Sequence, residues 1–582
     1  MYNRQPANRT RLARLATGLW ARSGAIRVEA CRQDPRRRRG SRAVPRVLCT
    51  HASMSPDREA AGAGRPFTAA DLDACLKVLE ALALDRAQLA AISSEDRRRL
   101  LLAAGRVSRP ERAEQRELAR AFRKRDRHAQ RSADAALLDA VGIRVARREP
   151  VFRTPDALAP AAPPLSWADP AEEPASPPEA TEGPGPTAEP GAPELARPRK
   201  CYVCKAEFRK VHFFYDAMCA ACGDFNYRKR SQTAPLDGRV ALVTGARVKI
   251  GYQAAIMLLR AGARVIVTTR FPHDAARRFS AERDFDAWGS RVAIYGLDLR
   301  HTPSVELFTR HLLHTLDRLD FIINNACQTV RRPPGFYGHL IEGETAPVRS
   351  LPQGAQPPLR EYDALRASGT LPLVAGADPG AGLREPALLS QIPAPGDERL
   401  DELLFPQGRY DADLQQVDLR TLNSWRLTLA EVPTVEMLEV QLVNAVAPFV
   451  LNSRLKPLMM RRPTFDRHIV NVSAMEGQFY RRYKTDRHPH TNMAKAALNM
   501  MTRTSAPDYV KDGIFMNSVD TGWVTDEDPA ALAARKLEEH GFHPPLDIVD
   551  GAARICDPIF SGLLSGQHAY GQFFKDYMPT DW

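Results

Sequence analysis

The chain has 582 residues, 44% of them hydrophobic, and a formal net charge of +13. This length predicts about two to four folded units. The sequence has no apolar run of about 18 residues, so no membrane span is predicted. The positive charge does not indicate a nucleic-acid-binding body, because residues 1–53 account for eleven of the thirteen excess charges.

The basic head, residues 1–53, contains thirteen arginines and only two acidic residues, Glu29 and Asp34. An Arg-rich, acid-poor start is typical of an organelle transit peptide. The interpretation we favour over this one is an over-extended start, with Met54 as the initiator. Four of the nine cysteines cluster, which favours a reducing compartment, and we expect a cytoplasmic protein.

Residues 66–146 are expected to form a small helical module. Thr68 precedes apolar residues that recur with helical spacing, and Ser94 and Ser108 precede two further helical patterns. Residues 155–199 are rich in Pro, Ala and Glu, so they predict a linker.

Residues 200–230 predict a zinc module. Two Cys-x2-Cys pairs, separated by fourteen residues, offer four thiolates for one tetrahedral structural zinc ion: Cys201, Cys204, Cys219 and Cys222. Phe208, Phe213, Phe214 and Tyr215 are expected to pack a small core around it. The basic residues nearby favour docking of a protein partner over nucleic acid, because the rest of the chain is near neutral.

From residue 236 onward, short apolar runs alternate with helical patterns. Strands are predicted at 240–244, 265–269, 292–297, 321–324, 469–472 and 515–519, and helices near 251–261, 302–317, 436–459 and 492–508. This alternation predicts an α/β fold, a Rossmann-like doubly wound parallel sheet. Residues 328–430 interrupt the pattern as an insertion, which we place over the active-site mouth.

The first of these strands runs into a glycine turn at Gly245–Gly251. The N–H groups and dipole of the following helix favour a phosphate, and glycines let the backbone approach it. Lys249 replaces the middle glycine; it either brings an ammonium near the phosphates or blocks the approach. Arg270 follows the second strand, where no acid stands, which favours NADP, with NAD as the alternative.

These motifs resemble those of the short-chain dehydrogenase/reductase family. The family's Thr-Gly-x-x-x-Gly-x-Gly stands here as Thr244–Gly251, its Asn-Asn-Ala-Gly as Asn324–Cys327, and its Pro-Gly turn as Val519–Trp523. The resemblance covers roughly residues 236–582. It implies that a nicotinamide dinucleotide is held by Thr244, Gly245, Arg247, Ile250, Gly251, Arg270, Asp298, Asn324, Ala326, Lys495 and Thr525.

The resemblance also implies catalytic positions at Asn444, Ser473, Thr491 and Lys495. In the family a tyrosine, acidified by the lysine and the cofactor, exchanges the proton, while a serine holds the substrate oxygen. Here Thr491 replaces the tyrosine, and Ala474 replaces the second serine of Asn-x-Ser-Ser, leaving Ser473 as the first. A threonine hydroxyl is a poor general acid or base at neutral pH.

Three side chains are candidates to replace the tyrosine: His490, Tyr480 and Tyr483. The first hypothesis is therefore an oxidoreductase using NAD(P)(H) on an unidentified small carbonyl or alcohol. The alternative is a catalytically silent NAD(P)-binding scaffold or sensor whose zinc module docks a protein. Because the family commonly pairs through the helix of Lys495, the resemblance also implies a homo-oligomer.

Overall fold

The computed structural model describes residues 67–156, 194–368, 378–393, 402–481 and 484–582. The predictions for the basic head, for most of the linker and for Tyr483 lie outside these residues. The chain separates into two compact units, Met1–Pro110 and Glu111–Trp582.

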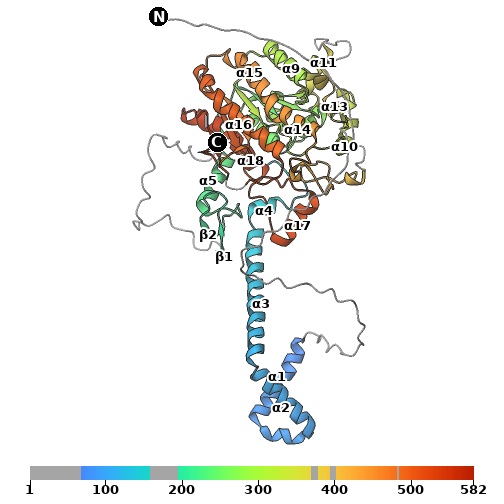
Figure 1. The fold of residues 1–582 in the computed structure, drawn as a ribbon, viewed down its shortest axis with the longest axis vertical. Helices are drawn as coiled ribbons and strands as arrows, with labels where there is room; N and C mark the ends of the chain where they lie inside the picture. Colours follow the sequence, from blue (N-terminus) through green and yellow to red (C-terminus); the bar gives the residue numbers. More distant parts are fainter. Residues whose placement is uncertain (1–66, 157–193, 369–377, 394–401, 482–483) are drawn as a thin grey trace, which may run out of the picture. The chain divides into compact units, whose positions relative to one another are not determined.

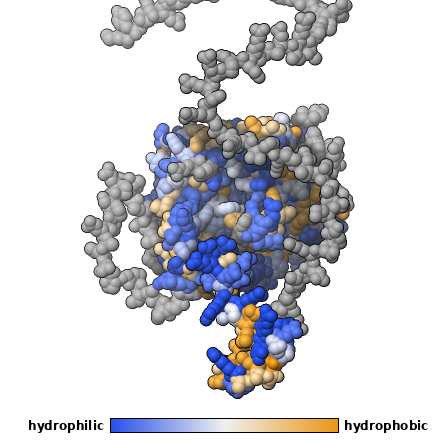
Figure 2. Space-filling model, turned by 60° about the horizontal axis from the view of Figure 1, so that its bottom comes forward, coloured by the Kyte–Doolittle hydropathy of each residue, from blue (hydrophilic) through white to orange (hydrophobic). Residues whose placement is uncertain are grey.

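The first unit contains helices α1 (Ala69–Leu84) and α2 (Ser94–Ser108), joined by the 3-10 turn η1 (Arg86–Ala91). Thr68 caps α1 in a capping box with Asp71, as its position predicts. None of the residues 67–110 is buried, and many apolar side chains are exposed, as the orange areas of Figure 2 show. The helical module was predicted to run to residue 146, beyond the end of the first unit at Pro110. Its last two helices, α3 (Arg112–Asp139) and α4 (Gly142–Ala146), belong to the second unit.

The centre of the second unit is an eight-stranded sheet in the order β10-β9-β8-β7-β6-β3-β4-β5. Six strands match the predicted ones to within a few residues: β3 (Val240–Thr244), β4 (Arg264–Thr269), β5 (Val292–Gly296), β6 (Phe321–Asn324), β7 (Arg467–Ser473) and β8 (Ile514–Asp520). All six are parallel. The strand order reverses at β3 and β6, so the predicted doubly wound Rossmann-like sheet is confirmed.

Two short strands extend the sheet beyond the prediction. β9 (Phe573–Lys575) pairs parallel with β8, and β10 (Met578–Thr580) pairs antiparallel with β9. Every residue of β3, β5 and β7 is buried, which is typical of parallel strands covered by helices on both faces. Figure 1 labels four of these helices: α9 (Thr302–Thr315), α15 (Ala447–Met460), α16 (Pro489–Tyr509) and α18 (Ile548–Ser565). A fifth, α6 (Lys249–Arg260), packs against β3, β4 and α18.

The predicted helix at 436–459 is observed in three parts. α14 (Thr434–Gln441) continues through a π-helical turn, Leu442–Val446, into α15. The stretch Thr434–Met460 is long and apolar enough to cross a membrane by length and composition alone. It packs against α9 and α16 within the fold, and 39% of its most apolar 18-residue window is buried.

The insertion packs against the edge strand β5. Its helices are α10 (Pro334–Thr345), α11 (Arg360–Ala367), α12 (Ala381–Arg384) and α13 (Pro386–Leu389). Tyr362 is buried in the central core and donates a hydrogen bond to the Leu383 carbonyl at 2.6 Å. At Gly296, the end of β5, a Cβ would lie 2.8 Å from Pro386 Cγ. The insertion therefore covers an edge that would otherwise be open to another strand.

The four-cysteine module begins earlier than its predicted start at residue 200. β1 (Glu194–Lys200) pairs antiparallel with β2 (Glu207–Lys210), and α5 (Ala220–Arg230) follows. The prediction of a linker was wrong for residues 194–199. They lie in β1, and Leu195 is buried in the module's apolar core with Tyr215 and Met218. Phe213 was expected in that core, but its side chain is 63% exposed.

Candidate nucleotide and catalytic site

The glycine turn between β3 and α6 has the close packing that its sequence predicts. Gly245 has a φ of +66°, and a Cβ there would lie 2.8 Å from the Ala326 Cα. A Cβ at Gly251 would lie 2.7 Å from the Gly245 carbonyl oxygen. Lys249 has a φ of +58°, in the left-handed region that favours glycine, so the lysine keeps the backbone conformation of the glycine it replaces.

Next to this turn, hydrogen bonds of polar side chains connect the C-terminal ends of β3, β6 and β7. The Thr244 hydroxyl accepts the Ala326 N–H at 3.0 Å, and the Asn325 amide donates to the Thr244 carbonyl at 3.0 Å. The Asn324 amide donates to Asn452 and Asn471, both at 2.8 Å. Thr244 and Asn324 thus shape the site through protein partners. Sequence reasoning missed the structural role of Asn325, Asn452 and Asn471.

A cavity of about 610 Å³ opens at the reversal of strand order. This volume is in the range of small-molecule sites. Eight of the predicted cofactor residues line it: Gly245, Arg247, Ile250, Gly251, Arg270, Asp298, Ala326 and Thr525. Thr244, Asn324 and Lys495 are not in its lining. The insertion contributes Phe336, Tyr337 and residues 415–418, and so forms one wall.

Arg270 lies at the C-terminal end of β4, where this wall meets the cavity. Its Nη2 donates to the Tyr337 hydroxyl at 2.6 Å, and its guanidinium lies 4.6 Å from the centre of the Tyr337 ring. Although burial raises the pKa of the Tyr337 phenol, the charges of Arg270, Arg332 and Arg247 outweigh burial and lower it. Three arginines therefore surround Tyr337 at this end of the cavity; Arg247 and Arg332 are paired with Asp274 and Asp418, respectively.

Two other predicted cofactor residues have charged partners. Arg247 forms an ion pair with Asp274 at 2.6 Å, on α7 (Pro272–Ser280). Asp298 is paired with Arg300 at 2.7 Å; although burial raises the pKa of the Asp298 carboxyl, Arg300 keeps it below its ordinary value. Both side chains are thereby fixed in orientation at the cavity wall.

The four predicted catalytic residues are all buried. Asn444 lies in the π-helical turn, where its Oδ1 accepts the Gln328 N–H at 2.8 Å; such turns are frequent at functional sites. Lys495 Nζ donates to the Val472 carbonyl at 2.7 Å. The Ser473 and Thr491 hydroxyls have no hydrogen-bond partner within the described residues. A buried hydroxyl without a partner costs about 1–3 kcal/mol, so these two groups are candidates to contact a ligand.

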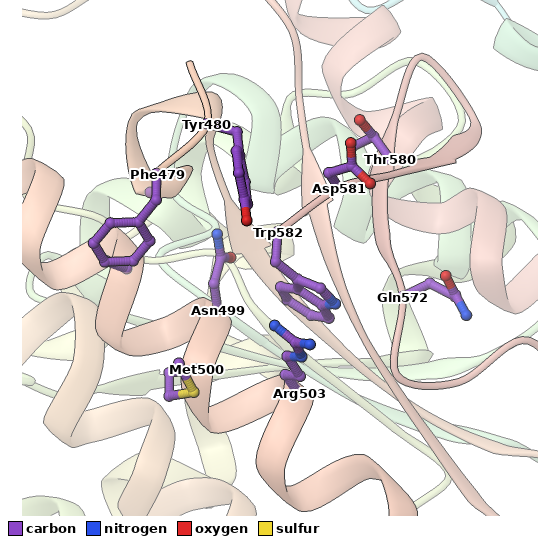
Figure 3. A pocket seen from close by; sticks show the side chains of 11 residues that line it. Phe479, Tyr480, Asn499, Met500, Arg503, Gln572, Thr580, Asp581 and Trp582 are labelled. Carbon is purple, nitrogen blue, oxygen red and sulfur yellow. The ribbon is translucent and has the colours of Figure 1, made fainter. Parts of the chain in front are cut away.

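The candidates for the missing tyrosine lie in different places. His490 is buried next to Thr491, with its Nε2 3.5 Å from Glu436 Oε1. Tyr480 is 86% exposed and lines a separate pocket with Arg503 and Trp582, as Figure 3 shows. None of Ser473, Thr491 and Lys495 lines that pocket. Within the described residues, His490 is thus the candidate beside the threonine.

Sequence reasoning missed one ionisable group near the catalytic positions, Asp520. It ends β8 directly opposite Ser473 in the strand register, and its Oδ1 accepts the Met475 N–H at 3.2 Å. Burial, together with the charge of Glu476, raises the pKa of this carboxyl to about 6. The available signal was an acidic residue at the end of a strand that begins with the apolar run Ile514–Met516.

The raised pKa of Asp520 predicts a pH-dependent stability. Since the folded pKa of about 6 exceeds the ordinary 3.8, this carboxyl stabilises the fold fully below about pH 4, and its contribution is lost as the pH rises through 6. Asp520→Asn, which stays neutral, is therefore expected to gain about 1–3 kcal/mol over wild type at pH 7.5 but not at pH 4. Urea unfolding at both pH values measures this. The exposed Asp317→Asn is the control, and an equal difference at both pH values would contradict the expectation.

The four cysteines form one cluster. Their Sγ atoms all lie within 4.8 Å of one another, and Cys204 Sγ and Cys219 Sγ are 3.7 Å apart. Four sulfurs about 2.3 Å from a central zinc ion would be about 3.8 Å apart, so the donor set fits zinc. Although burial raises the pKa of the Cys201 thiol, hydrogen bonds from the backbone of Cys219, Cys204 and Val203 lower it to about 7, which favours a thiolate at this position. Burial raises the pKa of the Cys219 and Cys222 thiols, so the spacing of the four sulfurs is what supports the zinc site.

Comparison with known proteins agrees with this geometry. A family model for short chain dehydrogenases matches residues 239–336, and one for enoyl-(acyl carrier protein) reductases matches residues 423–542. Uncharacterized protein R665 of Acanthamoeba polyphaga mimivirus is 32% identical over 62% of this chain and 71% of its own. The chain belongs to the short-chain dehydrogenase/reductase family, as its motifs predict.

Other relatives match shorter regions. Retinol dehydrogenase 12 of Bos taurus is 35% identical over 18% of this chain and 34% of its own length. The chain thus spans about a third of that relative. Among solved structures, a Pseudomonas aeruginosa RhlG/NADP active-site complex aligns with 58% of this chain and 94% of its own, at 18% identity and a TM-score of 0.36.

Proposed function

We propose that this protein is an oxidoreductase that binds NADP in preference to NAD and acts on a small carbonyl or alcohol. The observation that carries the proposal is Arg270, which lines the cavity at the end of β4, where no acidic residue stands to bind a ribose hydroxyl. The glycine turn and the start of α6 supply N–H groups for the pyrophosphate at the same cavity.

Titration of the purified protein with NADPH and NADH tests this proposal. We expect both to bind, NADPH more tightly, and a screen of aldehydes and ketones with the bound cofactor then to reveal turnover. If neither nucleotide binds, the proposed function is overturned. If NADH binds as tightly as NADPH, the preference assigned to Arg270 is overturned.

Arg270→Ala is expected to weaken NADPH binding about 10- to 100-fold, because one or two charge-assisted hydrogen bonds to the phosphate are lost. NADH binding should change much less. The matched control is Arg264→Ala at the opposite end of β4, where Arg264 pairs with Glu361 away from the cavity lining. Equal losses for the two nucleotides would show that Arg270 does not bind the phosphate.

Several side chains have defined parts in the proposed reaction. When bound, the cofactor supplies or accepts the hydride. The Ser473 and Thr491 hydroxyls donate hydrogen bonds to the substrate oxygen, and Lys495 holds the nicotinamide ribose. His490, which is buried next to Thr491 in the chain, is the residue that exchanges the proton as a general acid or base.

A catalytically silent scaffold is the second candidate. It is favoured by the fact that neither Ser473 nor Thr491 lines the described cavity. His490→Gln distinguishes the two functions, with cofactor affinity as its control. Loss of turnover with unchanged NADPH affinity supports the enzyme. Cofactor binding without turnover in wild type supports the scaffold.

We also propose a structural zinc ion in the four-cysteine cluster, which the spacing of the sulfurs supports. Freshly purified protein is expected to contain about one zinc per chain. Cys219→Ser together with Cys222→Ser should abolish it, while Cys327→Ser, an exposed cysteine outside the cluster, should not. Metal analysis measures each value. Absence of zinc in wild type would overturn the proposed zinc site.

Two expectations from the sequence stay predictions: docking of a protein partner by this module, and formation of a homo-oligomer.

A further inference from the structure

The four-cysteine module is anchored to the Rossmann-like sheet domain through buried polar contacts with α18. Arg230 donates to both carboxylate oxygens of Asp547, at 2.6 and 2.7 Å. The Tyr215 hydroxyl donates to Asp550 at 2.6 Å, and Arg554 donates to Asn226 at 2.6 Å. α5 lies beside α18 in Figure 1. The module therefore has a fixed position on the sheet domain.

The module also contacts the turn that follows β8. Tyr202, which stands between the candidate ligands Cys201 and Cys204, accepts a hydrogen bond on its hydroxyl from the Trp523 N–H at 3.1 Å. The preceding residue, Gly522, has a φ of +77°, and a Cβ there would lie 3.1 Å from the same hydroxyl. Tyr202 thus packs closely against the backbone of this turn.

One apolar cluster joins the module to two walls of the nucleotide cavity. Cys201, Tyr215 and Met218 of the module share it with Val524, and Ile250 packs against it. Ile250 lines the cavity from the first turn of α6. The residue after Val524 begins the segment Thr525–Ala533, which supplies a further part of the cavity lining.

We propose that the four-cysteine module is a functional part of the nucleotide site. Tyr202 is a positioning residue: it fixes the Gly522–Val524 turn and so sets the place of the segment Thr525–Ala533 against the bound nucleotide. Metal in the four-cysteine cluster orders the loop that carries Tyr202. Metal binding and nucleotide binding therefore strengthen each other, and by thermodynamic linkage the two effects are equal. This inference rests on the nucleotide binding and the zinc site proposed above.

Tyr202→Phe in the full chain tests the positioning role. We expect the zinc content to stay at the wild-type value and NADPH to bind about three- to tenfold more weakly, the loss of one hydrogen bond. The Trp523 amide should also exchange its hydrogen faster in the absence of any nucleotide. The matched control is Tyr227→Phe, a half-buried tyrosine of the same module with no contact to the turn among the described residues.

The linkage is tested by the zinc affinity of the protein, measured at equilibrium by competition with a colorimetric chelator. Saturating NADPH is expected to raise the zinc affinity of wild type about three- to tenfold, and to raise it much less in Tyr202→Phe. Unchanged NADPH affinity in Tyr202→Phe, or a zinc affinity of wild type that NADPH does not change, overturns the inference while leaving the proposed function intact. Wild type that binds no nucleotide, or that holds no zinc, overturns this inference together with the proposal that failed.

Discussion

Arg230→Ala is expected to lower the free energy of unfolding of the second unit by about 3–5 kcal/mol. The guanidinium lies between Asp547 and Asp550 and is almost completely buried, as both carboxylates are. Removing it leaves two buried carboxylates close together without the one cation that pairs directly with both. Breaking a buried ion pair on one side is among the most destabilising substitutions.

Urea unfolding, followed by circular dichroism, measures the loss. Arg228→Ala is the control, because Arg228 lies on the same helix and is exposed, and its effect should stay within about 0.5 kcal/mol. A loss below about 1 kcal/mol for Arg230→Ala would mean that the module is not held to α18 through this pair.

Lys495→Met is expected to weaken NADPH binding at least about tenfold, or by about 1.4 kcal/mol. The ammonium is buried on α16, and its hydrogen bond to the Val472 carbonyl holds it at the end of β7. The substitution removes the positive charge and the donors that the family uses at the nicotinamide ribose, while keeping most of the side-chain volume.

Calorimetric titration of the folded variant measures this change. Lys511→Met, an exposed lysine just beyond the end of the same helix, should bind NADPH as wild type does. Unchanged affinity in Lys495→Met would show that the lysine has only a structural role through Val472.

The parallel sheet could be predicted closely because its strands are buried on both faces, which makes them short continuous apolar runs. The strands β9 and β10 could not, because three residues each, with Lys575 and Pro579 among them, give no such run. Helix α18 was also missed. It contains Gly551, Pro558 and buried charged residues, which tertiary contacts satisfy and which a sequence pattern alone does not explain.

In the candidate site, too, some features could be predicted from the sequence and others could not. The backbone around the nucleotide turn could be predicted, because Gly245 and Gly251 stand where no Cβ fits. The partners of Arg270 and Arg247 could not, since Tyr337 lies in the insertion and Asp274 in a helix without a motif. Tyr480 is near the catalytic positions in sequence, but it is turned into another pocket (Figure 3).

The pairing of Arg230 with Asp547 also has a consequence for the order of folding during synthesis. The two residues are 317 positions apart in the chain. The module's cysteines therefore leave the ribosome long before the helix that completes their surroundings. Contacts so distant in sequence form late and slowly. Until α18 is made, the nascent module keeps its thiols and apolar side chains uncovered, so early metal capture would protect it while the rest of the chain is still being synthesised.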